Sequence, residues 1–177
     1  MEASRFPLRL VPVAEADLEI IAALVNRAFA THPFMRGGNR TSPDGLRYEA
    51  AEAGEFLVSE REGRIVASAM IRACHPELDA PETAIDYQLP TNGLYFGLAA
   101  VEPELMSSGG GRALLTEAER IARERGHTHV VLTTLYEFGL PPYYERFGYV
   151  TVANEDFPES HWGMGAPHRM AHMEKAL

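Results

Sequence analysis

The sequence predicts an α/β (α+β) protein: a single domain, residues 1–177, built on a mixed, mostly antiparallel twisted sheet with helices on both faces. Three observations support this prediction. The chain has 177 residues and is 46% hydrophobic, which suits one domain with a sizeable core. Apolar runs typical of strands alternate with runs of helical periodicity. Two strand-like runs are joined by a tight turn at Gly63, which begins an antiparallel meander.

The first half of the chain contains a strand, two helices and a hairpin. Residues 9–13 form a short apolar run of strand type, and residues 15–30 place their apolar side chains on one helical face. A second helix over residues 42–54 begins with Ser-Pro and ends at a glycine. The hairpin strands are expected at residues 56–59 and 65–71.

The second half continues the alternation and brings the expected number of strands to about seven. Helices are expected at residues 112–126 and 142–147, and strands at residues 94–101, 130–133, 149–152 and 168–173. Three segments lack regular apolar repeats, and we expect them to form loops around a cleft: residues 32–40, 75–93 and 154–167.

Composition and charge exclude several classes of protein. The formal net charge of −9 argues against binding to nucleic acid or to an anionic membrane, because phosphate contacts need clustered Lys and Arg. The single cysteine, Cys74, excludes an internal disulfide framework and a multi-cysteine zinc ribbon. No apolar run reaches membrane-spanning length, and the first residues lack the apolar core of a signal peptide. We therefore expect a soluble cytoplasmic protein.

Residues 94–126 combine a strand, a glycine cluster and a helix in direct succession. A helix start presents unpaired N–H groups and a positive dipole, so this arrangement is typical of an anion site. Its spacing excludes two phosphate loops: Arg112 follows Gly111 where the Walker A loop needs lysine, and Leu114 stands where the dinucleotide fingerprint needs glycine. The glycines alone leave two interpretations open, a loop around a pyrophosphate with Arg112 supplying charge, or a flexible turn without a ligand.

Two motifs carry a resemblance to a known family. Residues 101–115 have the sequence VEPELMSSGGGRALL, which resembles the acetyl-CoA loop of the GNAT N-acetyltransferase superfamily, V-x-P-x-x-[Q/R]-x-x-G-x-[G/A]-x-x-L-[L/M]. Residues 143–149, YYERFGY, are similar to its F-Y-E-[K/R]-x-G-[F/Y] element. The motifs occur in family order at a family-like separation, and the expected strands and helices match the family layout along essentially the whole chain. The resemblance implies a sheet that is splayed between its fourth and fifth strands.

The resemblance also implies site residues. The pantetheine arm of acetyl-CoA would be hydrogen-bonded like an added strand near Ala99, Ala100 and Val101, and Glu137 stands where many members have an asparagine that contacts the cofactor arm. Tyr144 would protonate the departing CoA thiolate. The pyrophosphate would be bound by the glycine loop: Met106, Ser107, Ser108, Gly109, Gly110, Gly111 and Arg112. Met106 and Ser107 depart from the usual Gln or Arg and Gly.

The proton acceptor has no counterpart in the motifs. Some members carry a carboxylate on the fourth strand, and Tyr95 occupies that place. A phenol is a poor base at neutral pH. We therefore expect an ordered water that passes the proton to Glu137, Asp86, His75 or a backbone carbonyl.

Two other reactive side-chain types are expected to have no catalytic role. Cys74 and His75 are neighbours on a strand and point to opposite faces, so they do not predict a nucleophile pair. His168 and His172 lie four residues apart on a strand with no acidic cluster beside them, and His161 lies upstream, so we expect no metal and assign these histidines to the cleft or the surface.

The implied activity is acetyl transfer from acetyl-CoA to a primary amine by direct attack in a ternary complex, without an acyl-enzyme. The acidic balance beside the expected cleft favours a cationic small-molecule acceptor, and the acids concerned are Glu137, Glu145, Glu155 and Asp156. A peptide or protein amine, a catalytically weak acetyl-CoA sensor, and an interaction subunit that uses residues 32–40 stay open as alternatives. The resemblance also leaves a homodimer open.

Overall fold

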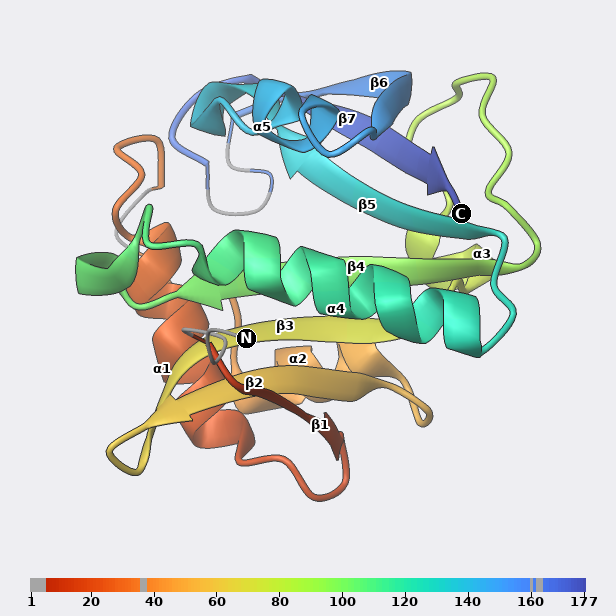
Figure 1. The fold of residues 1–177 in the computed structure, drawn as a ribbon. Coiled ribbons are helices and arrows are strands. Elements are labelled where there is room, and N and C mark those ends of the chain that lie inside the picture. The colour runs from red at the N-terminus through yellow and green to blue at the C-terminus, as the bar shows by residue number, and fades with distance from the viewer. Residues whose placement is uncertain (1–5, 36–37, 160, 162–163) are drawn as a thin grey trace.

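Seven strands form one mixed sheet in the computed structural model, which describes residues 6–35, 38–159, 161 and 164–177. The strand order is β1-β2-β3-β4-β5-β7-β6 (Figure 1). The strands are β1 (Leu8–Pro12), β2 (Glu55–Arg61), β3 (Arg64–Ala73), β4 (Gly93–Val101), β5 (His129–Leu135), β6 (Val150–Phe157) and β7 (His168–Ala176). Neighbouring strands are antiparallel except β4 and β5, which confirms the predicted sheet.

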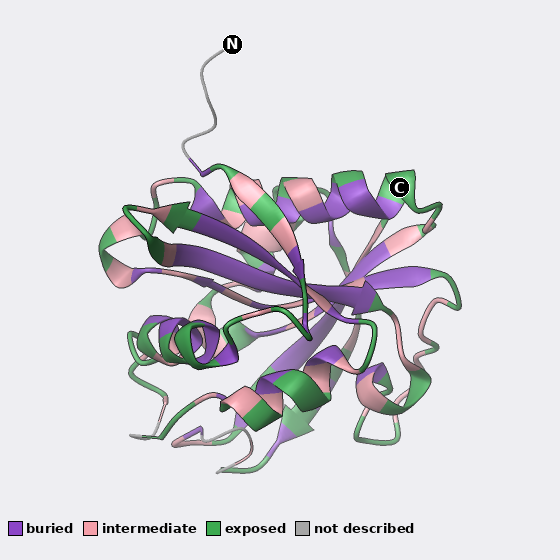
Figure 2. Ribbon diagram, turned by 90° about the horizontal axis from the view of Figure 1, so that it is seen from below, coloured by how far each residue is buried: buried purple, intermediate pink, exposed green. Residues whose placement is uncertain are grey.

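Helices cover both faces of this sheet. On one face α1 (Leu18–Phe29) packs against β3 and β4, with α2 (Pro43–Ala50) beside it; on the other face α4 (Gly110–Glu124) lies across β3, β4 and β5. Figure 2 shows the buried strands between helices whose buried residues face the sheet. The short elements are α3 (Pro76–Asp79), α5 (Pro141–Glu145) and the 3₁₀ turns η1 (Pro103–Leu105) and η2 (Tyr136–Phe138).

The long helices form where apolar periodicity and capping residues agree. The Asp17 carboxylate accepts a hydrogen bond from the Ile20 N–H at the start of α1, and the Ser42 hydroxyl accepts one from the Gly45 N–H at the start of α2. Each long helix buries one face: α1 and α2 share a core with β2, β3 and β4, and α4 packs on a second core formed by the opposite side of the same strands. The two cores fix β4 between α1 and α4.

The parallel pair β4 and β5 separates soon after it forms. The two strands pair only from Gly93 to Tyr95 opposite His129–Val131, and beyond this point they diverge (Figure 1). On the other side of β4 the register against β3 shifts, so that Leu98 and Ala99 face one residue of β3. This is a β-bulge, and Leu98 has a φ of 50°, in the left-handed region. The bulge and the short pairing together open the sheet at the carboxyl ends of β4 and β5.

Several predicted boundaries are wrong. β6 continues to Phe157 and includes the first four residues of the segment that was expected to form a loop from Asn154, and β7 continues to Ala176. Backbone pairing with β7 extends β6: Asp156 lies opposite Arg169, and its carboxylate accepts a hydrogen bond from the Arg169 Nε at 2.7 Å. The second helix ends at Ala50, before the glycine that was expected to stop it. Trp162 of the predicted third loop lies outside the described residues.

No helix in the described part of the chain is long and apolar enough to cross a membrane.

Candidate functional site

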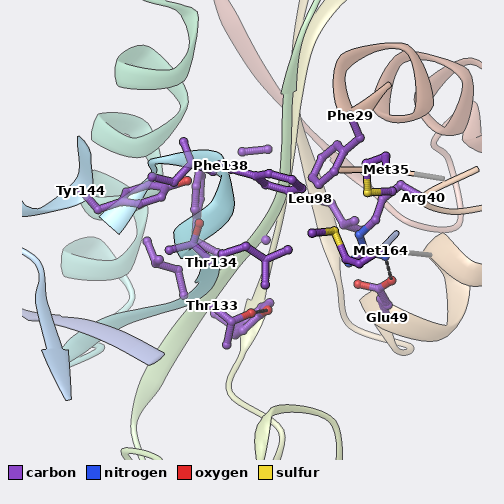
Figure 3. A pocket seen from close by; sticks show the side chains of 17 residues that line it. Phe29, Met35, Arg40, Glu49, Leu98, Thr133, Thr134, Phe138, Tyr144 and Met164 are labelled. Carbon is purple, nitrogen blue, oxygen red and sulfur yellow. Dashed lines mark hydrogen bonds and ion pairs between the residues drawn. The ribbon is translucent and has the colours of Figure 1, made fainter. Parts of the chain in front are cut away.

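The opening between β4 and β5 is the centre of the candidate site. A cavity lies in this opening, with β4 residues from Tyr95 to Ala99 on one side and β5 residues from Leu132 to Leu135 on the other (Figure 3). Most of the remaining lining is apolar and comes from α1, η2 and two loops: Phe29, Met35, Phe138, Leu140 and Met164. A cavity with an apolar lining and an open strand edge suits an acyl chain attached to a group that can hydrogen-bond to backbone.

The glycine turn lies at the same end of β4. Gly109 is the residue before the first turn of α4, with a φ of 98°, and no side chain caps the helix there. Gly110 packs so tightly that an added Cβ would lie 2.9 Å from the Val101 side chain. The first N–H groups of α4 therefore have no side-chain acceptor and lie directly beyond the end of β4. These are the features of an anion site.

Arg112 and Tyr143 flank this turn. Arg112 lines a surface cavity beside the first turns of α4, together with Gly109 and Phe6. A Cβ added at Gly111 would lie 3.0 Å from the Tyr143 hydroxyl, so α5 packs close to the first turn of α4. Burial raises the pKa of Tyr143, although Arg146 and Arg112 oppose the shift. The turn thus combines backbone donors with one nearby guanidinium.

Tyr144 reaches the opening from α5. Pro141 and Pro142 occupy the first turn of that helix, where proline is favoured, and direct the following tyrosines back toward the sheet. The Tyr144 ring packs edge-on against Tyr143 and Tyr149 and lines the cavity (Figure 3). Burial raises its pKa above the ordinary value of a phenol, so the hydroxyl keeps its proton at neutral pH and is available as an acid.

Tyr95 lies on the β4 side of the cavity. Its hydroxyl is 3.0 Å from the Thr133 Oγ1, across the point where β4 and β5 separate, and the Arg72 guanidinium lies 4.7 Å from the centre of its ring. Burial raises the pKa of Tyr95 to about 12. Its phenol is neutral at physiological pH and is not a base.

A second cavity is continuous with the first. Tyr95, Thr133, Arg40 and Glu49 line both, and the second extends toward β7 and α3. Its further charged or titratable lining residues are Tyr48, Arg72, Asp79, Glu82 and His172. The two cavities together extend from Tyr144 to the charged residues near α3 and β7, which leaves room for two substrates to meet.

A comparison with protein families identifies the family of the chain. The model of the Acetyltransferase (GNAT) family matches residues 21–149, which include both sides of the opening, the glycine turn and Tyr144. The chain belongs to the GNAT acetyltransferase family. The family resemblance predicted from the two sequence motifs is confirmed.

Known proteins similar to this GNAT chain agree with that assignment. It is 34% identical over 133 residues to the mycothiol acetyltransferase of Cellulomonas flavigena. The match covers 72% of this chain and 36% of that protein, so the chain spans about a third of the length of this curated relative.

Solved structures share the fold at low sequence identity. A ribosomal-protein-alanine N-acetyltransferase from Brucella melitensis has 18% identity and a TM-score of 0.68, with 97% of this chain and 99% of that chain covered. A protein from Salmonella typhimurium, in a structure with its cofactor acetyl-CoA, has 18% identity and a TM-score of 0.66, with 98% and 95% covered.

Two of the predicted site residues, Ala99 and Tyr144, line the cavity at the opening. Ala100 and Val101 follow Ala99 along β4, residues 106–109 form the turn before α4, and residues 110–112 are the first residues of α4. Glu137 lies in η2 and does not line either cavity. Its Oε1 accepts a hydrogen bond from the Arg169 N–H at 3.0 Å, and its Oε2 is buried without a partner among the described residues.

The predicted proton acceptors lie elsewhere. Glu137, Asp86 and His75 line neither cavity. His75 is occupied at the start of α3, where its Nδ1 accepts a hydrogen bond from the Glu77 N–H. Burial raises the pKa of the Cys74 thiol to about 12, so it holds no nucleophilic thiolate at neutral pH.

The acidic residues expected beside the cleft need a correction. Glu145, Glu155 and Asp156 do not line either cavity, and Asp156 is paired with Arg169 on the surface. Glu155 is buried and reaches the site only through His172, whose Nε2 lies 2.7 Å from its Oε1. Their place at the cavities is taken by Glu49, Asp79 and Glu82.

His168 and His172 of β7 are also buried, so the surface position that was one of the two expected for them is wrong. Hydrogen bonds from Thr83 and His172 hold the pKa of Glu155 low, against the effect of burial, so Glu155 is an anion and the His172 Nε2 carries a proton. His168 lies 3.3 Å from the His161 ring nitrogen. Within the described residues no group of three or more His, Cys, Asp or Glu side chains is placed to hold a metal ion.

Residues 32–40 contribute Met35 and Arg40 to the cavity wall, as a cleft loop was expected to do. Glu49 is the residue that the sequence motifs missed. It follows the apolar face of α2 by ordinary helical spacing, and only the packing of α2 beside β3 brings it to the opening.

Proposed function

We propose that the chain transfers an acetyl group from acetyl-CoA to a primary amine. One observation carries the proposal: the open edge between β4 and β5 leads directly into the uncapped turn before α4, and Tyr144 lines the cavity between them. A pantetheine arm needs a strand edge, a pyrophosphate needs backbone donors, and a departing thiolate needs an acid.

Acetyl-CoA fits the residues present. The backbone of Ala99, Ala100 and Val101 would bind its pantetheine arm, and the turn from Met106 to Arg112 would bind its pyrophosphate. We keep Glu137 in the proposed contact set, because its Oε2 is buried without a described partner. Bound there, acetyl-CoA supplies an activated thioester.

Tyr144 acts in this proposal as the acid. Because burial raises its pKa, the free phenolate is unfavourable, and we expect its proton to move to sulfur in concert with cleavage of the C–S bond. As the tetrahedral intermediate collapses, the nitrogen that becomes the amide nitrogen loses a proton to the Tyr144 oxygen, which restores the phenol. A backbone N–H at the bulge around Leu98 would stabilise the oxyanion.

The acceptor in the proposal is a cationic small molecule with a primary amine. Three carboxylates line the second cavity and support it, and two of them have close partners: Asp79 is paired with Arg72, and the Glu82 Oε2 lies 3.0 Å from the His161 Nε2. Glu49 is the carboxylate nearest to the acyl cavity, since it lines both. The cytoplasmic location and the homodimer remain predictions of the sequence, and neither nucleic acid nor a membrane enters the proposal.

Free-thiol release tests the function. The protein is mixed with acetyl-CoA and with each of a panel of amines that includes amino sugars, polyamines, lysine and a peptide with a free N-terminus. Release that depends on one class of amine names the acceptor class. Saturable binding of acetyl-CoA without release for any amine would favour the sensor alternative. Met106, Glu137 and the missing carboxylate at Tyr95 are the residues that motivate this alternative.

A further inference from the structure

The proposed acetyl transfer lacks a proton acceptor on β4. An amine is mostly an ammonium ion at neutral pH and must lose a proton before it attacks a thioester. Tyr95 stands at the family position for a carboxylate, yet its hydroxyl contacts Thr133 and its phenol is held neutral. Another group has to accept this proton.

Glu49 is placed to do so from α2. Among the described residues that line the acyl cavity it is the one carboxylate, and it also lines the second cavity. Its side chain is 31% exposed, so an acceptor can reach it. Figure 3 shows Glu49 and Tyr144 on opposite walls of the cavity, as a base for the amine and an acid for the sulfur require.

The position of Glu49 is fixed by a buried ion pair. The Arg72 guanidinium donates to both carboxylate oxygens of Asp79, at 2.7 and 2.6 Å, and its Nε donates to the Glu49 backbone oxygen at 2.6 Å. The same guanidinium lies over the Tyr95 ring. Arg72 therefore holds the end of α2 against the face of β4 that carries Tyr95.

The Glu49 carboxylate itself is only loosely paired. The Arg40 Nη1 lies 3.4 Å from its Oε1, a long contact for an ion pair. At this length the pair is weak, so an incoming ammonium group can compete with Arg40 for the carboxylate. The charged and titratable groups around it are Arg40, Arg72, Tyr95 and Asp79.

The other carboxylates at the cavities are committed elsewhere. Asp79 is buried and paired with Arg72, and the Glu82 Oε2 lies 3.0 Å from the His161 Nε2. The Nδ1 of His172 has no described partner, but it is buried and lines only the second cavity. His172 is the rival acceptor that an experiment has to separate from Glu49.

We propose that Glu49 binds the ammonium group of the acceptor and removes the proton that frees its lone pair. The inference rests on the proposed acetyl transfer. The ammonium gives one proton to the Glu49 carboxylate, which passes it to solvent. The amine then attacks the thioester carbon, the C–N bond forms and the C–S bond breaks. Sulfur receives the Tyr144 proton, and the second proton lost by nitrogen restores Tyr144.

The test uses Glu49→Gln, which keeps the shape of the side chain and removes its charge. We expect kcat/KM for an alkylammonium acceptor to fall about 100-fold or more, the usual size of a general-base effect. A weakly basic acceptor such as a hydrazide, which is already neutral at pH 7, should lose far less. With the alkylammonium acceptor, the kcat/KM of Glu49→Asp should lie between the values of the wild type and of Glu49→Gln. Glu52→Gln, an exposed change just after α2, is the matched control and should match the wild type.

Two binding measurements accompany the rates. Calorimetry should show acetyl-CoA binding to Glu49→Gln unchanged and binding of the alkylammonium acceptor, measured in the presence of CoA, weakened about tenfold. Unchanged rates and unchanged acceptor binding in Glu49→Gln would overturn the inference. A loss of kcat/KM seen in His172→Gln but not in Glu49→Gln would also overturn it. Failure of the wild type to release thiol with any amine would instead remove the proposed function itself.

Discussion

At the scale of single residues, the site depends on a few groups whose surroundings set their chemistry. Tyr144 and Tyr95 are both phenols at one cavity, and burial raises the pKa of each. They differ in their contacts: the Tyr95 hydroxyl is bound to Thr133, whereas no described residue bonds to the Tyr144 hydroxyl. Tyr144 can therefore donate its proton to a reacting atom without first breaking a hydrogen bond to a described residue.

Replacement of Tyr144 by Phe tests this difference. Because the ring contacts with Tyr143 and Tyr149 remain, we expect an unchanged melting temperature and nearly unchanged acetyl-CoA affinity. The loss of the acid should lower kcat about 100-fold. Thiol release with the best amine measures this. Tyr136→Phe, on the exposed part of η2, is the control, and full activity of Tyr144→Phe would show that another group protonates sulfur.

Gly109→Val tests the anion turn. Gly109 has a φ of 98°, where a branched side chain costs about 1–2 kcal/mol, and we expect the strain to displace the first N–H groups of α4. We expect acetyl-CoA binding to be lost in calorimetry.

The matched control for that change is Gly63→Val in the β2–β3 turn, at a φ of 74°. At both glycines an added Cβ meets nothing within 4 Å, so both variants carry backbone strain without a clash. Gly63→Val should lose similar stability and keep its affinity for acetyl-CoA. Equal affinity in the two variants would mean that the turn before α4 does not bind the anion.

At the scale of elements, the Arg72–Asp79 pair joins β3 and α3 and holds the end of α2. The side chains are only 5% and 2% exposed, so removal of one partner leaves an unpaired buried charge. Asp79→Ala should lower the free energy of unfolding by about 3–5 kcal/mol in urea denaturation. Asp156→Ala, which breaks an exposed pair with Arg169, should cause no measurable change.

The double variant Arg72→Met/Asp79→Leu separates stability from function. An apolar pair of similar volume commonly replaces a buried ion pair without loss, so most of the stability should return. The backbone oxygen of Glu49 would still lack its donor, so we expect thiol release to stay low. Recovery of both stability and activity would show that Arg72 does not position Glu49.

Local sequence patterns predicted the elements better than their ends. The strands and helices that carry strong apolar periodicity lie where they were expected, including β4, α4 and β5. The extra length of β6 could not be predicted, because residues 155–157 extend it by backbone pairing with residues 168–170 of β7 rather than by an apolar pattern of their own. Such pairing exists only once the strands are aligned.

At the scale of the whole molecule, the sequence predicts the part of the site that lies in continuous motifs and misses the part that packing brings together. The glycine turn and Tyr144 belong to continuous motifs, so the sequence predicts them together with the family. Glu49, Arg72 and Asp79 come from three elements and meet only when α2 and α3 pack on the sheet. The opening itself follows from the short pairing of β4 with β5 and from the bulge at Leu98.

The central claim is that acetyl-CoA occupies the opening between β4 and β5 and the turn before α4. Titration of the labelled protein with acetyl-CoA, followed through its backbone amide resonances, tests where the ligand binds as well as whether it binds. We predict that the amides of residues 99–101 and 107–112 shift and saturate near one equivalent, while those around Gly63 stay in place. Saturation without shifts in these two segments, or no shifts at all, would contradict the account.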